Sequence, residues 1–200
     1  MVERQIRARG IKDSRVLEAM LSVPREEFIP ADLRDRSYDD GPLPIGHDQT
    51  ISQPYIVALM TACILPDPGT TATTVLEIGS GCGYQSAILA RLFQSVLSFE
   101  RVPKLAAESR LRLASLGIEN VTVHCGDGSR GMEGTSFQAI LAAAAFRQYP
   151  ADLEQQVAEG GKMVLPAGGN MQYLYLVTRR DGKLERSRLT GVRFVPMIES

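Results

Sequence analysis

The chain has 200 residues, 44% of them hydrophobic, which suits one domain with a sizeable core. Its 22 basic and 23 acidic residues leave a formal net charge of −1, so we expect no broad attraction to nucleic acid or to a membrane surface. The three cysteines form no Cys-x-x-Cys pair, which favours a reduced, intracellular setting and argues against a metal site. The N-terminal residues lack a signal-peptide pattern, and the longest apolar run is too short to span a bilayer.

The N-terminal third of the chain reads as a helical segment with a loop. Apolar residues at helical spacing across 16–21 predict a first helix, capped by Asp13 or Ser14. Prolines and glycines across 41–54 predict a long irregular loop, and such a loop inside a compact domain is more often functional than idle. A second helix is predicted over 55–65.

From residue 73 onward, strand and helix patterns alternate, which predicts a Rossmann-like α/β sheet with its first five strands parallel. We predict strands at 73–79, 95–100, 120–125, 137–143, 161–166, 172–179 and 186–194. We predict helices at 84–92, 102–116 and 150–158. The last two strands, joined through an Asp-Gly turn, read as an antiparallel hairpin. The expected organisation is a single domain, 1–200, in which a helical and substrate-loop segment (1–70) precedes a cofactor-binding α/β core (71–200).

The most informative stretch runs from Val75 to Tyr84, where an apolar strand leads into three glycines spaced Gly-x-Gly-x-Gly. An apolar helix follows at once. A strand that ends in a glycine turn and opens a helix lets the backbone approach a nucleotide-like ligand closely. Glu100, twenty-one residues after Gly79 at the end of the next predicted strand, is placed to accept hydrogen bonds from both hydroxyls of a ribose.

The details of this stretch discriminate between nucleotide ligands. The spacing differs from the dinucleotide fingerprint Gly-x-Gly-x-x-Gly, and no Lys or Arg lies between Glu77 and Ala90 to neutralise a pyrophosphate. A P-loop is excluded because no Gly-Lys-Ser/Thr follows. A ligand with a ribose, a positive centre and no phosphate fits better, and S-adenosylmethionine is such a ligand. The alternative is a tight structural turn with Glu100 as a solvated strand end.

Several further segments, in the expected order along the chain, resemble protein-L-isoaspartate O-methyltransferases. The matching stretches are the N-terminal Met-Val-Glu-Arg-Gln-Ile, 42–54, 75–84, 126–128, 160–166 and 192–196. The block Gln-Thr-Ile-Ser-Gln-Pro at 49–54 is the specific element, because the glycine motif is common to all class I methyltransferases. The resemblance implies a monomeric, cytoplasmic enzyme with a class I methyltransferase sheet. Its expected reaction is methylation of the α-carboxylate of isoaspartyl residues, after which the ester closes to a succinimide.

The same resemblance assigns roles to individual residues. Ser52 is expected beside the accepting carboxylate, with Thr50 supporting the same loop. The expected cofactor-binding residues are Glu77, Gly79, Ser80, Gly81, Gly83, Glu100, Arg101, Asp127 and Gly128. A carboxylate acceptor is already ionised at neutral pH, so no general base is required. The alternatives are that Thr50 and Ser52 cap the following helix, and that Asp127-Gly128 is an ordinary turn.

The chain departs from the family pattern after its fourth predicted strand. Gln138 replaces an acid, Ala142 a frequent polar residue, and Phe146 a proline. These departures keep two other hypotheses open, a carboxyl methyltransferase with a different peptide or small-acid acceptor and a non-catalytic S-adenosylmethionine-binding module. Of the two histidines, His47 is interpreted as a loop-surface residue and His124 as a packed or rim residue.

One further interpretation concerns the predicted helix 102–116. Its basic residues Lys104, Arg110 and Arg112 look like a solvated face.

Overall fold

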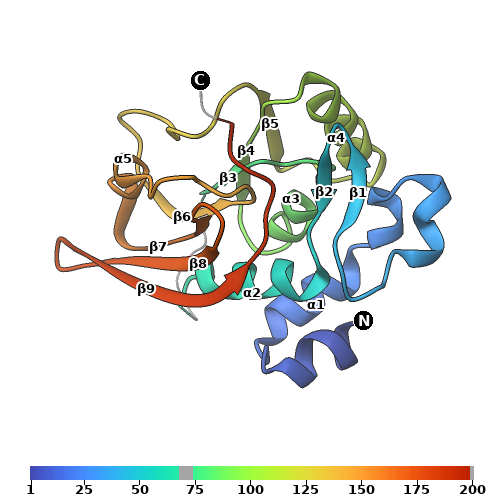
Figure 1. Cartoon of the computed structure of the whole chain (residues 1–200), viewed down its shortest axis with the longest axis horizontal. Helices are drawn as coiled ribbons and strands as arrows, with labels where there is room; N and C mark the ends of the chain where they lie inside the picture. The colour runs from blue at the N-terminus through green and yellow to red at the C-terminus, as the bar shows by residue number, and fades with distance from the viewer. Residues whose placement is uncertain (68–73, 199–200) are drawn as a thin grey trace.

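A seven-stranded mixed sheet forms the centre of the computed structural model, which describes residues 1–67 and 74–198. Its strands are β3 (Thr74–Ile78), β4 (Ser95–Glu100), β5 (Val121–Cys125), β6 (Phe137–Ala142), β7 (Val157–Ala167), β8 (Gln172–Arg180) and β9 (Lys183–Val192). They lie in the order β5-β4-β3-β6-β7-β8-β9 (Figure 1). The first five in chain order are parallel, and β8 and β9 are antiparallel to their neighbours. The predicted fold class is therefore confirmed; residue 73 and the predicted division at 70/71 lie outside the described residues.

Four of the five α-helices in the described part of the chain pack on one side of the sheet, and the last in chain order packs on the other. They are α1 (Ser14–Ser22), α2 (Pro54–Ile64), α3 (Tyr84–Leu89), α4 (Pro103–Ser115) and α5 (Ala151–Glu154). A π-helical turn spans Val2–Ile6, and 3-10 turns span Arg7–Arg9, Arg25–Phe28 and Ala31–Arg36. Asp13 caps α1 by accepting a hydrogen bond from the Arg15 backbone N–H at 3.0 Å.

The core divides into two clusters because side chains alternate between the faces of a strand. In β6, Leu141 joins the cluster that includes residues of α1 to α4, whereas Ile140 packs into the opposite cluster with Leu153 of α5. Strand β3 divides in the same way, with Val75 on the first face and Leu76 on the second. Both central strands are apolar because both of their faces are covered.

The chain order creates a switch point at β3. From β3 the chain moves to β4 and β5 on one side of the sheet, and β6 then returns to the other side. Ligands of open α/β sheets bind outside the carboxyl ends of the strands at such a point. The turns after β3, β4, β5 and β6 therefore meet at the place where a site is expected.

The expectation of an irregular loop over 41–54 was wrong. The segment forms a hairpin of β1 (Leu43–Gly46) and β2 (Gln49–Ile51), with His47 and Asp48 at its turn. Both turn residues have positive φ, 53° and 56°, as a two-residue type I′ turn requires. The prolines and glycines hid the strands, and a His-Asp turn lacks the Asn-Gly or Asp-Gly signature.

The predicted helix 150–158 was largely wrong as well. Only Ala151–Glu154 is helical, and β7 starts at Val157, four residues earlier than predicted. Gly160 and Gly161 suggested a loop, but they lie within the strand at a register shift against β6. A Cβ on Gly161 would lie 2.8 Å from the Ala158 carbonyl oxygen, so glycine permits this close approach.

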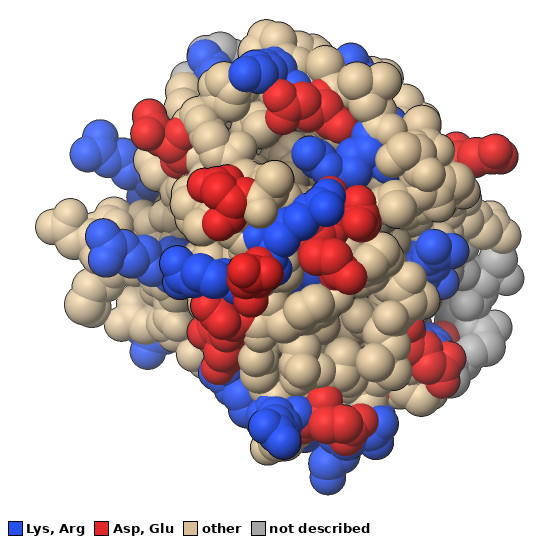
Figure 2. Space-filling view, turned by 90° about the vertical axis from the view of Figure 1, so that its right-hand side faces the viewer, with Lys and Arg blue, Asp and Glu red and all other residues tan. Residues whose placement is uncertain are grey.

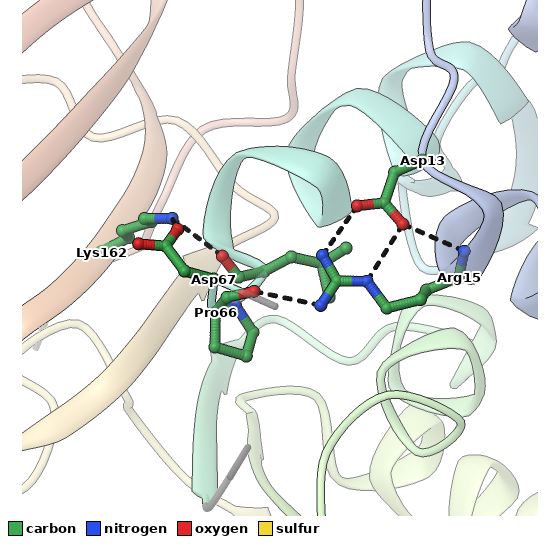
Figure 3. A network of polar contacts seen from close by, with 6 residues as sticks. Asp13, Arg15, Pro66, Asp67 and Lys162 are labelled. Atoms are coloured by element: carbon green, nitrogen blue, oxygen red, sulfur yellow. Dashed lines mark hydrogen bonds and ion pairs between the residues drawn. The ribbon is translucent and has the colours of Figure 1, made fainter. Parts of the chain in front are cut away.

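A polar network joins the N-terminal segment to the sheet, as Figure 3 shows. Arg15 pairs with Asp13 at 2.7 Å and donates to the Pro66 carbonyl at 3.1 Å. Lys162 on β7 donates to the Leu65 carbonyl at 2.9 Å and to Asp67 at 3.0 Å. The chain that leaves α2 is thus held from both sides.

The surface carries both signs of charge. On the face drawn in Figure 2, basic and acidic side chains are interspersed, and neither forms a continuous field. Among the described residues, no helix combines the length and apolar character needed to cross a membrane.

Candidate functional site

A pocket opens at the carboxyl ends of the central strands, where the switch point predicts one. Its wall comes from the β1–β2 hairpin and α2, the glycine turn after β3, the ends of β4, β5 and β6, and the C-terminal segment after β9. Among the residues expected from the sequence, the wall contains Thr50, Ser52, Gly79, Ser80, Gly81, Glu100, Arg101, Asp127 and Gly128. Two expected residues, Glu77 and Gly83, are not part of it.

The glycine turn forms the floor of the pocket. Gly79, Gly81 and Gly83 all have positive φ, at 91°, 52° and 91°, a region that side-chain-bearing residues rarely adopt. The backbone N–H groups of Gly79 and Ser80 donate to the Phe99 carbonyl at 2.8 and 3.2 Å. These bonds fix the turn after β3 to the end of β4, so the two strand ends form one surface.

Glu100 occupies the rim beside this turn and is only 6% exposed. Its carboxylate accepts hydrogen bonds from the Gly81 N–H at 2.7 Å and from the Val102 N–H at 2.9 Å. A carboxylate has about four lone-pair positions. Two backbone donors therefore hold the group in place while it keeps acceptor capacity for a ligand with two hydroxyls.

The ends of β4 and β5 supply a flat, partly apolar part of the wall. Phe99, which lines the pocket, stacks on the exposed His124, with ring centroids 5.3 Å apart. A Cβ on Gly128 would lie 2.5 Å from the Phe99 Cβ, so only glycine fits there. Asp127 accepts from the Ser129 N–H at 2.8 Å and lies 3.9 Å from Arg101. The ordinary-turn interpretation of Asp127-Gly128 describes this backbone geometry, but both residues also line the pocket.

Glu77 lies beneath the pocket rather than in its wall. The side chain is fully buried, and its Oε2 accepts hydrogen bonds from the hydroxyls of Ser86 and Ser98 at 2.5 and 2.6 Å. Its other carboxylate oxygen has no hydrogen-bond partner among the residues that the structure describes. Burial raises the pKa of Glu77 to about 7, and the two hydroxyls oppose that shift only in part. Glu77 therefore supports the glycine turn from below.

Thr50 lies in β2 and Ser52 follows that strand, so both line the pocket from a part of the chain distant in sequence from Glu100. Helix α2 begins at Pro54 with Gln53 as its N-cap, and no side chain in 1–67 or 74–198 makes a capping hydrogen bond. The capping interpretation of Thr50 and Ser52 was therefore wrong. Thr50 is exposed and Ser52 half-buried, and in the described part of the chain neither hydroxyl takes part in a hydrogen bond. Both groups are available to a ligand.

A second, broader groove adjoins the pocket and shares five of the described residues with it, Thr50, Ser52, Ala143, Val195 and Pro196. Its volume is about 1100 Å³. The far wall consists of two segments, 169–173 with Tyr173 and 191–196 with Arg193. The two hydroxyls thus stand where a narrow pocket meets a groove wide enough for a chain.

Sequence reasoning missed the C-terminal wall. After β9, residues 195–198 line the pocket, and Figure 1 shows this segment running past the carboxyl ends of the central strands. Val195 and Met197 form backbone hydrogen bonds with Ala145, and Arg101 donates to the Ile198 carbonyl at 3.1 Å. In the sequence, only the motif at 192–196 pointed to this segment, and no role was assigned to that motif.

The solvated-face interpretation of the helix 102–116 was wrong for Arg112. This residue is half-buried and donates to the Cys82 carbonyl in the glycine turn at 2.8 Å. Arg110 is exposed but donates to the Val123 carbonyl, also at 2.8 Å. Lys104 is exposed as expected. His47 is exposed at the turn of the β1–β2 hairpin, also as expected.

The three departures from the family pattern lie away from the reacting region. Gln138 donates to the Glu159 carbonyl near the start of β6, at the opposite end of the strand from the pocket. Ala142 and Phe146 are buried in the second core cluster. Ala143 and Ala144, which lie between them, form the wall instead. None of the three substituted side chains is among the described residues that line the pocket or the groove.

The pocket lies at the switch point of the sheet, with a glycine turn after one strand and a glutamate at the end of the next. These features define a class I S-adenosylmethionine-dependent methyltransferase. The chain belongs to the Protein-L-isoaspartate(D-aspartate) O-methyltransferase (PCMT) family, whose model matches residues 1–200.

Individual relatives agree with the family match. The chain is 50% identical to a protein-L-isoaspartate O-methyltransferase of Methanoregula boonei, over 99% of this chain and 91% of the relative. It is 48% identical to that of Koribacter versatilis, over 99% and 89% of the two chains. A solved structure from Plasmodium falciparum, assigned as a protein-L-isoaspartate O-methyltransferase and bound to S-adenosyl-L-homocysteine, superposes with a TM-score of 0.85 at 27% identity. That match covers 100% of this chain and 97% of the other.

Proposed function

We propose that this protein transfers a methyl group from S-adenosylmethionine to the α-carboxylate of L-isoaspartyl residues in damaged proteins or peptides. The observation that carries the proposal is the position of the Ser52 hydroxyl, which has no hydrogen-bond partner among the described residues and stands where the narrow pocket meets the groove. The methyl ester closes to a succinimide without further help from the enzyme, and hydrolysis then returns some normal aspartate.

The narrow pocket has the donor and acceptor groups that S-adenosylmethionine needs. Glu100 retains lone pairs for the two ribose hydroxyls, and Asp127 with Gly128 flanks the place for the adenine edge. The glycine turn, with Ser80, surrounds the place for the methionine end. Arg101 closes the rim through its bond to the C-terminal segment. When bound, the cofactor supplies an electrophilic methyl group on a positively charged sulfur.

On the acceptor side, the residues have to position a group that is already reactive. A carboxylate is ionised at neutral pH, so its oxygen attacks the methyl carbon without a general base. The hydroxyls of Ser52 and Thr50 hold the carboxylate by donating hydrogen bonds, and they add no charge that would compete with it. Attack neutralises one negative and one positive charge, so a closed and dry pocket favours it. The chain's main contribution is therefore orientation.

The groove supports a polypeptide acceptor rather than a small acid. It extends from Ser52 along the hairpin and the loop 169–171, so residues flanking an isoaspartyl site have a place to lie. The expected partners are damaged proteins rather than nucleic acid, in keeping with the interspersed surface charges. We further propose that the enzyme works as a monomer in the cytoplasm.

The test uses methyl-labelled S-adenosylmethionine and two peptides that differ only in an isoaspartyl or a normal aspartyl linkage. Base-labile label on the isoaspartyl peptide alone is the expected result. A small-acid panel run in parallel identifies a different acceptor. Cofactor binding with no label on either peptide contradicts the proposed function.

A further inference from the structure

Arg25 is a buried cation directly behind the loop that carries Ser52. It begins the 3-10 turn after α1, and its side chain has no exposed surface. The guanidinium donates through Nε to the Ser37 carbonyl and through Nη2 to the Ser52 carbonyl, both at 2.8 Å. The Arg25 guanidinium thus joins its own turn to the chain at Ser37 and at Ser52, which are fifteen residues apart in the sequence.

The Arg25 charge has no carboxylate partner in the part of the chain that the structure describes. None of the ion pairs there involves Arg25, and its Nη1 has no hydrogen-bond partner. The guanidinium lies over the Tyr84 ring, 4.9 Å from its centroid, and Tyr84 lines the pocket. Burial lowers the pKa of Arg25, yet a guanidinium stays protonated at neutral pH.

An unpaired buried cation costs free energy, so a structural role alone is a poor reason to keep it. Its hydrogen bonds point to another use. The bond to the Ser52 carbonyl fixes the peptide plane of the residue whose hydroxyl faces the acceptor. The stacking on Tyr84 fixes the same guanidinium against the first residue of α3, directly after the glycine turn. Arg25 therefore sets the distance between the acceptor loop and the cofactor side of the pocket.

We propose that Arg25 is a positioning residue for methyl transfer, which holds Ser52 in register with the cofactor side of the pocket through its bond to the Ser52 carbonyl. This inference rests on the proposed function. Arg25 touches neither ligand in this account, so it acts on the rate of transfer and not on cofactor affinity. Displacing a reacting group by about 1 Å is enough to cost about 100-fold in rate.

The test compares Arg25→Lys and Arg25→Gln with the wild-type protein. Lysine keeps the charge but has no planar fork, so it cannot make both carbonyl bonds in the same geometry. We expect both variants to bind S-adenosylmethionine within about twofold of wild type by calorimetry. We expect kcat on the isoaspartyl peptide to fall about 10- to 100-fold at saturating cofactor. Cofactor binding also reports that each variant is folded, and Arg25→Lys alone decides the test if Arg25→Gln is insoluble.

Arg91→Lys is the matched control, because Arg91 is exposed and lines neither the pocket nor the groove. Both the cofactor affinity and the kcat of this variant are expected to match those of the wild type. Arg25→Lys with wild-type kcat overturns the inference, and so does a parallel loss of cofactor affinity and kcat. Absence of turnover in the wild-type protein would instead reject the proposed function, so the two failures are distinct.

Discussion

The two sides of the pocket are assembled in different ways. The cofactor side comes from one continuous region between Gly79 and Gly128, in which each contributing turn directly follows a parallel strand. The acceptor side joins a hairpin near the start of the chain, helix α2, the end of β6 and the C-terminal segment. Main-chain geometry dominates the first side, whereas side chains and contacts distant in sequence dominate the second.

This difference teaches where each kind of specificity resides. The glycine turn and Glu100 are held by backbone N–H groups, so main-chain hydrogen bonds organise the cofactor side. The Ser52 hydroxyl has no partner among the described residues, and its loop depends on the distant Arg25. We therefore expect substitutions on the two sides to separate cofactor binding from methyl transfer.

The largest expected effect is on the cofactor side, from Glu100→Ala. Loss of two hydrogen bonds from the ribose hydroxyls to a charged group, each contributing about 1.5 kcal/mol or more, predicts at least a 100-fold weaker cofactor affinity. Calorimetric titration measures it. Glu119→Ala is the control, because Glu119 is exposed and does not line the pocket. Cofactor affinity within threefold of wild type in Glu100→Ala would show that the ribose lies elsewhere.

The second prediction concerns the stability contributed by Glu77, which lies beneath the cofactor side of the pocket. Burial raises the pKa of Glu77 from 4.5 to about 7, so the folded state binds its proton more tightly than the unfolded state does. The contribution of Glu77 to the free energy of unfolding is greatest below pH 4.5. It decreases as the pH rises to about 7 and stays constant at higher pH. The total change is on the order of 3 kcal/mol.

Denaturant unfolding of wild-type protein and Glu77→Gln at pH 5 and pH 8 tests this behaviour. The neutral glutamine cannot titrate, so the stability of Glu77→Gln relative to wild type should be greater at pH 8 than at pH 5. A relative stability that does not change between the two pH values would show that Glu77 titrates normally.

On the acceptor side, Ser52→Ala should lower kcat about 10- to 100-fold, since it removes one positioned donor to the carboxylate. Cofactor affinity should stay within about twofold of wild type. Steady-state kinetics with the isoaspartyl peptide, together with calorimetry, measures both quantities. Ser187→Ala on exposed β9 serves as the control. Equal loss of cofactor affinity and kcat would mean that the loop only shapes the cofactor side.

The smallest effect is expected outside both sides, in the network of Figure 3. Lys162→Met removes an ion pair whose partner Asp67 has a 79% exposed side chain, so the loss of stability should be about 1 kcal/mol or less. Thermal unfolding measures it, with kcat unchanged. A larger loss would show that the bond from Lys162 to the Leu65 carbonyl, and not the ion pair, holds the chain after α2.

The same contrast explains what could be predicted from the sequence. The cofactor side was predictable because glycine spacing, strand ends and Glu100 form a local pattern, and parallel strands bring their carboxyl ends together. Glu77 was the exception, since the pattern could not tell a residue in the wall from one beneath it. Its burial depends on Ser86 and Ser98, which lie on other elements.

The acceptor side was predictable only through resemblance. No periodicity relates Ser52 to Arg25, which holds its carbonyl, or to Val195 across the pocket, so long-range packing decides these contacts. The prediction of a helix over 150–158 was wrong for a related reason. Pairing of Val157 with Phe137 of β6 starts β7 before Gly160, which local propensity reads as a break.

The central claim is that one pocket holds the cofactor against Glu100 and the acceptor against Ser52. A crystal structure with S-adenosylhomocysteine and an isoaspartyl peptide tests it most directly. The account predicts ribose hydroxyls within about 3 Å of the Glu100 carboxylate, and the isoaspartyl α-carboxylate at the same distance from the Ser52 hydroxyl. The flanking residues of the peptide should lie in the groove. A peptide carboxylate bound away from Ser52, or a ribose that does not meet Glu100, would contradict the account.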